Sequence, residues 1–343
     1  MRAAALLAAL PLMTEAANYA AQRVTVDGIE VVRLTDASHK AQVSIAPTLG
    51  NNAYEFLVNG KNAMWFPVSN LAEFKAKPTF SGNPFLAPWA NRLDHDGFYA
   101  NGKHYTLNPH LNNYRRDGAK QPIHGLLSYA SEWNVTDVSA DAKGAEVTSR
   151  LEFWRYPDFM AQFPFAHTID MTYRLREGVL EVETSIENHS AETMPVSVAF
   201  HPYFKLHDSP RNSWKVTLPA KESYVLSSSL VATGEKKAMP YKNPQPLEGI
   251  SLDDVLGGLT PAENGRTEFA VEGAKERIAV LFGPKYPVSV VYSPKDRDFI
   301  CFEPMSGPTN AFNLKQAGKY DNLQSIPPGS KWRESFWIRP TGF

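Results

Sequence analysis

The chain of 343 residues carries a formal net charge of −1, and 43% of its residues are hydrophobic while 21% are charged. Nucleic acids and anionic membrane surfaces select proteins with a clustered basic excess, so this charge balance argues against either partner. The single cysteine, Cys301, excludes an intramolecular disulfide and a cysteine-ligated zinc cluster. A composition with 26 Pro, 21 Gly, 19 Phe, 14 Tyr and 7 Trp favours strands joined by turns.

An apolar run, residues 3–13, follows Arg2 at the N-terminus. It is too short for a membrane-spanning helix, which needs about 20 apolar residues. Its length and the preceding positive charge are typical of a secretory signal peptide, with cleavage after Ala17 or Ala20. We therefore expect export to the periplasm or the medium. A true start at Met13 or an Ala-rich frayed tail is the alternative, and the protein would then be cytoplasmic.

From Val24 onward the hydrophobic pattern has a period of two, which is typical of half-buried strands. Two Asn-Gly pairs, Asn59-Gly60 and Asn101-Gly102, predict tight hairpin turns because both positions of such a turn tolerate positive φ. Strand-like alternation also runs through residues 147–156 and 278–282. These segments indicate an antiparallel β protein.

The clearest hairpin is expected between residues 171–175 and 180–186, with Glu177-Gly178 as its turn. In the second segment apolar and small residues alternate with glutamates, which predicts a strand with a charged outer face. One short helix is expected at residues 252–256. We predict a leader at residues 1–20 and one domain at residues 24–343, folded as a large antiparallel β-sandwich.

Side chains suited to chemistry occur in four apolar, proline-containing segments, at Asn91-Arg92, His124, His201 and Glu303. Any one of them alone is more often a hydrogen-bonded structural group. Four segments of the same architecture instead favour a sugar site that carries out proton transfer. The sequence has no phosphate-binding loop, dinucleotide fingerprint or zinc-helix motif that would favour another chemistry.

Strand alternation predicts where His201 and Glu303 point. The small Ser197 and Ala199 share the face of His201, and Cys301 shares the face of Glu303, so both ionisable groups are expected on the non-core side of a sheet. Neighbouring aromatic rings should raise the pKa of the carboxyl toward neutrality, which suits a general base. The imidazole ordinarily titrates near neutrality and can serve as the acid.

In this order and spacing, the segments resemble the aldose 1-epimerase (galactose mutarotase) family over essentially the whole chain after Val24. The matching segments are Asn91-Arg92-Leu93, Gly97-Phe98, residues 101–108, Ile123-His124-Gly125 with Trp133, Asn188 with His201-Pro202-Tyr203-Phe204, Asp253-Asp254 and Phe302-Glu303-Pro304. Leu126 departs from the family pattern, because many members have a second glycine there. Leu126 lies in the loop that holds His124, so a leucine there could alter the conformation of that loop.

The resemblance implies a super-sandwich β fold and interconversion of the α and β anomers of a free aldose of the glucose or galactose class. It implies that Glu303 takes the proton of the C1 hydroxyl, that His201 protonates the ring oxygen, and that His124 steadies the ring oxygen or the C1 hydroxyl. The reaction transfers neither electrons nor groups, so we expect no cofactor. A small sugar is the expected partner, and the chain is expected to be a monomer or weak dimer.

The resemblance also implies hydroxyl-binding residues. Asn91, Arg92 and Asp253 are expected to hold the sugar, with Asp254 as the alternative to Asp253. Guanidinium and carboxylate groups suit vicinal hydroxyls. Aromatic rings suit the apolar face of a pyranose, and the candidates, each with core packing as its alternative, are Phe85, Trp89 and Tyr203.

Other readings lead to different chemistry. A mutarotase for phosphorylated hexoses would use Arg115 and Arg116, in the loop 112–120, to bind phosphate. A carbohydrate-binding module of the same fold would lack catalysis, although both the acid and the base are present here. A glycoside hydrolase normally needs two carboxylates, and only Glu303 has a strong claim.

A metal site is the last alternative. Its ligands would be His124, His201 and Glu303, but their spacing in the sequence does not support a metal, and we predict none.

Overall fold

The computed structural model describes residues 18–343. The predicted leader, residues 1–20, therefore falls almost entirely outside the described residues. The first strand, β1 (Tyr19–Val26), begins before the predicted domain boundary at Val24. Cleavage after Ala17 would leave β1 whole, whereas cleavage after Ala20 would remove its first two residues. Within the described range, no helix is long and apolar enough to cross a membrane.

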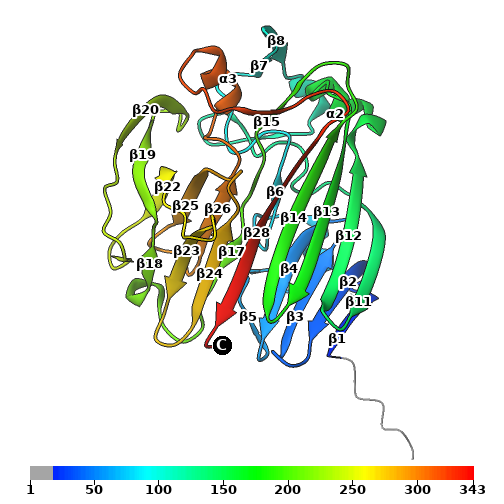
Figure 1. The fold of residues 1–343 in the computed structure, drawn as a ribbon, viewed down its shortest axis with the longest axis vertical. Coiled ribbons are helices and arrows are strands. Elements are labelled where there is room, and N and C mark those ends of the chain that lie inside the picture. The colour runs from blue at the N-terminus through cyan, green and yellow to red at the C-terminus, as the bar shows by residue number, and fades with distance from the viewer. Residues whose placement is uncertain (1–17) are drawn as a thin grey trace, which may run out of the picture.

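Antiparallel sheets dominate the structure, which confirms the predicted all-β class (Figure 1). The N-terminal sheet is a meander of β1, β2 (Ile29–Asp36), β3 (Ala41–Ala46), β4 (Asn52–Val58) and β5 (Lys61–Asn62). The largest sheet has the strand order β11 (Asn134–Asp141), β12 (Gly144–Glu152), β13 (His167–Arg176), β14 (Val179–Asn188), β28 (Lys331–Thr341), β24 (Arg277–Phe282), β23 (Thr267–Glu272), β18 (Lys215–Thr217) and β21 (Gln245–Pro246).

An eight-stranded sheet carries the residues of interest. Its order is β20 (Ala232–Ala238), β19 (Ala220–Leu226), β22 (Leu252–Leu259), β25 (Val288–Ser293), β26 (Ile300–Met305), β16 (Ala199–Phe200) and β6 (Phe85–Leu86), and β17 (Tyr203–Phe204) also pairs with β26. In Figure 1 these strands lie beside β23 and β24, and β28, in red, runs between that group and β14.

Short elements complete the described chain. Three small sheets are formed by β7 (Gly97–Ala100) with β8 (Lys103–Thr106), β9 (Arg115–Arg116) with β10 (Pro122–Ile123), and β15 (Met194–Val196) with β27 (Gln324–Ile326). The α-helices are α1 (Leu71–Ala76), α2 (Pro157–Gln162) and α3 (Ala311–Gln316), and single 3₁₀ turns occur at Pro109–Leu111, Phe153–Arg155 and Arg211–Ser213.

The predicted hairpin turns are confirmed. Asn59-Gly60 joins β4 to β5 and Asn101-Gly102 joins β7 to β8, and all four of these residues have positive φ. Asparagine and glycine adopt that left-handed conformation at low cost, so these sequences fix the turns locally. Glu177-Gly178 likewise connects β13 and β14, whose pairing runs from His167 to Arg176.

Two local predictions are wrong, one of a strand boundary and one of an element type. The strand expected at residues 147–156 ends at Glu152, where a 3₁₀ turn begins. The short helix expected at residues 252–256 is instead the start of strand β22. All five residues of this segment pair with β25, Leu256 also pairs with β19, and Leu252, Val255 and Leu256 are buried, so sheet pairing outweighs the local pattern.

One hydrophobic core joins the three large sheets. Apolar side chains from β2 and β3, from β13 and β14, and from β24 and β28 pack into it. The two faces of β26 are divided as the sequence predicts: Ile300 and Phe302 lie in this core, whereas Cys301 packs in a separate aromatic cluster on the other side. Val196, Val198 and Phe200 also lie in the main core. The opposite face of β26 is therefore left available for polar groups.

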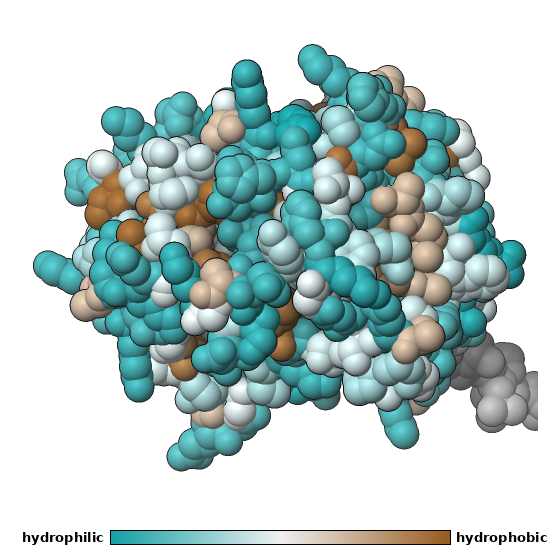
Figure 2. Space-filling view, turned by 90° about the horizontal axis from the view of Figure 1, so that it is seen from above, coloured by the Kyte–Doolittle hydropathy of each residue, from teal (hydrophilic) through white to brown (hydrophobic). Residues whose placement is uncertain are grey.

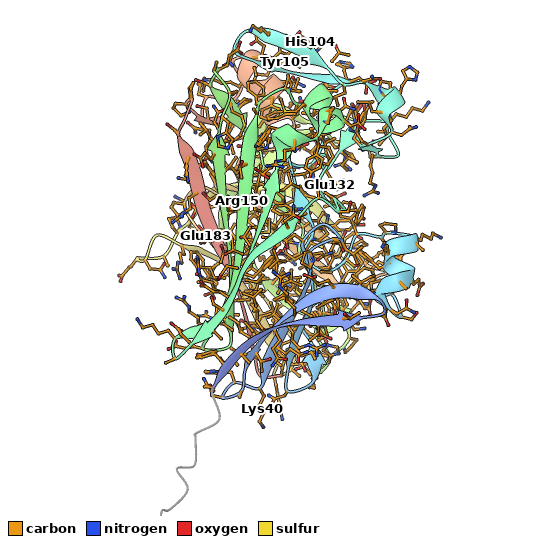
Figure 3. The ribbon with its side chains drawn as sticks, turned by 90° about the vertical axis from the view of Figure 1, so that its right-hand side faces the viewer. Lys40, His104, Tyr105, Glu132, Arg150 and Glu183 are labelled. Carbon is orange, nitrogen blue, oxygen red and sulfur yellow. The ribbon has the colours of Figure 1, made fainter. Side chains whose placement is uncertain are left out.

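The outer surfaces are polar. Seen from above, the molecule is mostly hydrophilic, with small apolar patches between charged side chains (Figure 2). Strands β12, β13 and β14 turn an alternating set of charged residues outward, of which Figure 3 labels Arg150 and Glu183. Arg150 pairs with Asp170 on the neighbouring strand at 2.7 Å.

Candidate active site

His201 and Glu303 face each other across paired strands of the eight-stranded sheet. Strand β26 pairs with β16 and β17 on either side of Glu303, and the paired residues are Ala199 with Met305 and Tyr203 with Cys301. The residues midway between these pairs, His201 and Glu303, lie opposite each other in the same antiparallel register. His201 Nε2 is 3.2 Å from Glu303 Oε1, and both side chains are buried.

The same sheet face carries Asp253. On β22 this residue pairs with Tyr292 of β25, and Tyr292 in turn pairs with Cys301 of β26, so all three side chains share the face of Glu303. Asp254 points the other way, where its carboxylate accepts a hydrogen bond from the Tyr241 hydroxyl at 2.6 Å. Strand register therefore separates these two neighbours and assigns Asp253 to the site.

Asn91 and His124 reach the site from loops. Both have left-handed backbones, with φ of 53° and 68°, and the His124 peptide N–H donates to the Asn91 carbonyl oxygen at 2.8 Å. Arg92 and Ile123 form an antiparallel bridge beside this bond. Main-chain hydrogen bonds therefore join the two loops. The left-handed backbone at Asn91 and His124 directs these two side chains toward the eight-stranded sheet.

The loop after His124 requires glycine at one position. Gly125 has φ of 65°, and a Cβ there would lie 2.1 Å from the carbonyl oxygen of Ala87. Leu126, where the family pattern often has a second glycine, is accommodated, because its side chain packs in the main core and its N–H donates to Ala87 at 2.7 Å. The leucine therefore leaves His124 at the site.

Arg92 is held from two sides. Its Nε donates to Asp117 Oδ2 at 2.5 Å, and its Nη1 donates to Asn91 Oδ1 at 3.1 Å. Burial would raise the pKa of Asp117, but hydrogen bonds from Arg92 and from the backbone of Gln121 and Ala119 lower it, so the carboxylate stays ionised. Asp117 was not identified from the sequence, since nothing in its loop distinguishes it from a surface aspartate.

A pocket of about 240 Å³ opens between the loops and the sheet face. All six residues singled out from the sequence line it: Asn91, Arg92, His124, His201, Asp253 and Glu303. The lining residues that the sequence did not indicate as site residues are Phe80, Asp117, Ile123, Val290 and Tyr292. Val290 pairs directly with Glu303, so correct strand pairing would have identified it.

Aromatic rings fix the imidazole. The Tyr203 ring stacks on His201 with centroids 4.6 Å apart and an interplanar angle of 4°, and Phe80 contacts both His201 and His124. Of the proposed sugar-stacking residues, Tyr203 lines the pocket. Phe85 and Trp89 lie in the main core instead, so for them the packing alternative is correct.

Burial controls the protonation of the pair. Loss of water raises the pKa of Glu303 well above its usual range; the Asp253 carboxylate raises it further and Arg92 opposes this. The raised carboxyl pKa expected from the sequence is therefore confirmed. Burial also lowers the pKa of His201 to about 3, so the expected titration near neutrality is wrong. Both groups favour their neutral forms, with one proton held by the carboxyl.

Three buried polar atoms at the pocket have no hydrogen-bond partner among residues 18–343: His124 Nδ1, His201 Nδ1 and Glu303 Oε2. Buried polar atoms are nearly always hydrogen-bonded in folded proteins, because leaving one unpaired costs about 1–3 kcal/mol. In the described part of the chain, no group of three or more His, Cys, Asp or Glu is arranged to hold a metal ion. The arrangement suits a small polyhydroxylated molecule that can both donate and accept hydrogen bonds.

Comparison with known proteins agrees with this geometry. A sequence profile of the aldose 1-epimerase family matches residues 30–339. YphB, an uncharacterised protein of Escherichia coli K12, is 24% identical over 269 residues, which cover 74% of this chain and 82% of YphB. The chain belongs to the aldose 1-epimerase family.

Solved structures show the same fold. A galactose mutarotase-like protein from Clostridium acetobutylicum superposes with a TM-score of 0.84 at 20% identity, covering 95% of this chain and 99% of the other. Galactose 1-epimerase from Lactobacillus acidophilus gives a TM-score of 0.67 at 16% identity, covering 94% and 98%. The fold is the galactose mutarotase-like β-sandwich.

Proposed function

We propose that this protein is an aldose 1-epimerase that interconverts the α and β anomers of a free aldose of the glucose or galactose class. The observation that carries the proposal is the contact between His201 and Glu303, an acid and a base whose Nε2 and Oε1 atoms lie 3.2 Å apart and which both line the pocket, each with a second buried polar atom unpaired among the described residues. Such a pair can exchange protons with two neighbouring oxygens of one sugar.

The chemistry follows from one proton shared by the pair. Transfer of the proton from Glu303 to His201 gives a carboxylate, which the nearby Arg92 stabilises, and an imidazolium. The carboxylate takes the C1 hydroxyl proton, the electrons of that O–H bond form the C1 carbonyl, and the C1–O5 bond breaks. The imidazolium protonates O5. Rotation about C1–C2 exposes the other face of the aldehyde, and the reverse transfers close the ring.

The remaining lining residues would bind and orient the sugar. His124, with Nδ1 unpaired, can hydrogen-bond the ring oxygen or the C1 hydroxyl. Asn91, Arg92 and Asp253 would hold hydroxyl groups. Each positioned proton transfer contributes on the order of 10²- to 10⁴-fold to the rate, so two transfers account for much of the acceleration without a cofactor.

The charges favour an uncharged sugar over a phosphorylated one. Of the two arginines that a phosphate could use, Arg116 is paired with Asp96 at 2.6 Å, and Arg115 is the one that lines the pocket. The charged residues around the pocket balance one another: Arg92 and Arg115 against Asp117 and Asp253. A phosphate would add two negative charges beside the Glu303 carboxyl, and would further oppose its ionisation.

Polarimetry tests the proposal. Freshly dissolved α-glucose, α-galactose and α-xylose should each relax to equilibrium faster with the purified full-length protein than with buffer. His201→Asn should retain the fold and sugar binding but lower turnover by about 10²-fold or more, the range for loss of one general acid. No acceleration for any of the three sugars would contradict the proposal, and sugar binding without acceleration would indicate a binding module.

A further inference from the structure

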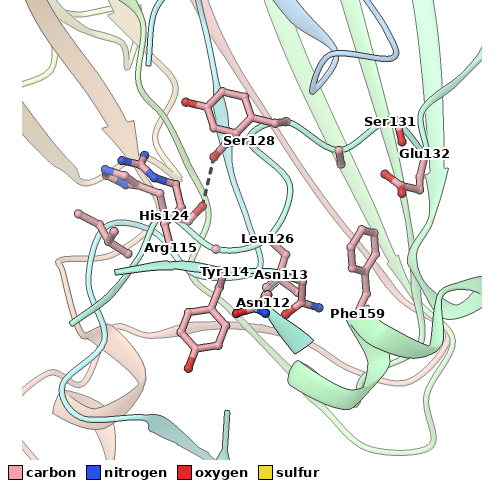
Figure 4. Close-up of a pocket in the computed structure, with 14 residues that line it drawn as sticks. Asn112, Asn113, Tyr114, Arg115, His124, Leu126, Ser128, Ser131, Glu132 and Phe159 are labelled. Atoms are coloured by element: carbon pink, nitrogen blue, oxygen red, sulfur yellow. Dashed lines mark hydrogen bonds between the residues drawn. The ribbon is translucent and has the colours of Figure 1, made fainter. Parts of the chain in front are cut away.

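A second pocket adjoins the first. It has a volume of about 310 Å³ and shares three lining residues, Arg115, Ile123 and His124, with the pocket that holds Glu303. In Figure 4, Arg115 and His124 lie at one end of this second pocket, and Ser131 and Glu132 lie at the other. None of the steps proposed above uses this space.

The lining of the second pocket is amphipathic. Leu126, Tyr129 and Phe159 supply apolar and aromatic surface, and the edge is formed by polar side chains such as Asn112, Ser131 and Glu132 (Figure 4). Pyranose rings have apolar faces and hydroxyl edges, and bind where aromatic surface and a few polar groups converge. The lining therefore has the chemistry of a sugar subsite.

The boundary between the pockets is built from ordered contacts. The Arg115 guanidinium lies 4.5 Å from the centre of the Phe80 ring. Phe80 lines the first pocket, and its ring contacts Tyr129 of the second pocket and His124, which lines both. Glu132 is the one carboxylate that lines the second pocket, at the end opposite Arg115 (Figure 4). Because Arg115 already offsets a carboxylate of the first pocket, Glu132 leaves the second pocket with no excess positive charge, which favours a neutral occupant over an anionic one.

We propose that the second pocket binds a neutral glycosyl unit joined to the aldose whose anomeric centre lies at His201 and Glu303. The preferred substrates are then reducing ends of disaccharides or short oligosaccharides. The proposal rests on the proposed epimerase function. Because the reaction needs a free C1 hydroxyl, the glycosyl unit must be linked through another oxygen of the reacting sugar.

Kinetics on matched sugars test this subsite. We expect the KM for at least one of maltose (1→4-linked), isomaltose and melibiose (both 1→6-linked) to lie about tenfold below that for glucose, as one or two added hydrogen bonds would give. Ser131→Trp should fill the second pocket from an exposed position that is not part of the first. It should raise that KM about tenfold and change the glucose kinetics by less than about twofold.

Ser139→Trp is the matched control, because Ser139 is exposed on β11 and lines neither pocket. It should leave the kinetics of all these sugars unchanged. Two outcomes would contradict the proposed subsite while the epimerase function stands. In the first, the protein turns over monosaccharides but prefers no disaccharide over glucose. In the second, Ser131→Trp affects glucose and disaccharides equally. Absence of turnover with every sugar would remove both.

Discussion

Two clusters of ionisable residues lie on different sheets, and they differ in whether their polar atoms have hydrogen-bond or ion-pair partners. On the outer face of the nine-stranded sheet, Arg174 is surrounded by Glu146, Glu181 and Glu183 at 3.0, 3.6 and 3.4 Å, and these side chains also reach solvent. In the pocket, the ion-pair partner of Glu303 among the described residues is His201, at 3.2 Å, and both side chains are buried.

The difference separates a structural arrangement from a reactive one. Around Arg174 every charge is near an opposite charge, and water and the neighbouring strands provide further partners. Glu303 instead remains with Oε2 unpaired among the described residues, in surroundings that oppose its ionisation. Such an arrangement lowers stability unless a ligand completes it, and this is common at catalytic sites.

The largest expected effect is that of Glu303→Gln. Glutamine is nearly isosteric and keeps hydrogen bonds to the sugar, but it cannot accept the C1 proton. We expect turnover to fall roughly 10²- to 10⁴-fold, about 3 to 5 kcal/mol of transition-state stabilisation. Polarimetric kcat and KM, together with the pH profile, measure this, and the acidic limb of the profile should flatten. A variant with normal turnover at saturating sugar would contradict the assignment of Glu303.

A smaller effect is expected for Asp117→Asn, which weakens the anchor of Arg92. The guanidinium should then be less well positioned for sugar hydroxyls, which raises KM by about tenfold with a smaller change in kcat. Asp96→Asn is the control, since it removes the partner of the neighbouring Arg116 outside the pocket. Equal effects of the two substitutions would indicate general loosening of the loop.

Stability should reveal the buried carboxyl through its pH dependence. Because the pKa of Glu303 is raised in the folded protein, its favourable contribution is complete below the usual glutamate pKa and is lost as pH rises through the raised value. Glu303→Gln should therefore gain stability relative to wild type as pH rises from about 5 to 8, by up to about 1 kcal/mol per pH unit. Denaturant unfolding at several pH values measures this difference.

His201 should show the opposite dependence and serves as the comparison. Its pKa is lowered to about 3 by burial, so its contribution is present above the usual histidine pKa of 6.5 and is lost as pH falls toward 3. His201→Asn should therefore gain stability relative to wild type in that acidic range. Parallel curves for wild type and both variants would mean that the two groups keep ordinary pKa values.

The smallest effect is expected in the outer cluster. Arg174→Met keeps much of the side-chain packing and removes a partly exposed charge from between three glutamates. Exposed ion pairs typically contribute about 0.2–1 kcal/mol, so the free energy of unfolding should change by no more than about 1 kcal/mol and kcat should not change. A loss of activity without a loss of stability would show that the two sheets are coupled in function.

Sequence patterns predicted those parts of the site that follow from local alternation. The faces of His201 and Glu303 followed from a period of two, and the Asn-Gly turns fixed their hairpins. Patterns failed where distant segments decide the outcome. The segment 252–256 is a strand because it pairs along its length with the distant strand β25. Phe80 and Asp117 lie in loops, and only the fold brings them into contact with His124 and Arg92. The pKa of His201 depends on burial, which sequence spacing does not measure.

The register that sets Glu303 opposite His201 also limits how this gene can change. One inserted or deleted residue within β26 would exchange its two faces, burying the carboxyl in the apolar core and turning Phe302 toward the pocket. The exposed turns between strands tolerate length changes far better. In descendants of this chain, insertions should therefore accumulate in the turns, while the spacing of residues 199–203 and 301–305 stays fixed even as the identities of the strand residues drift.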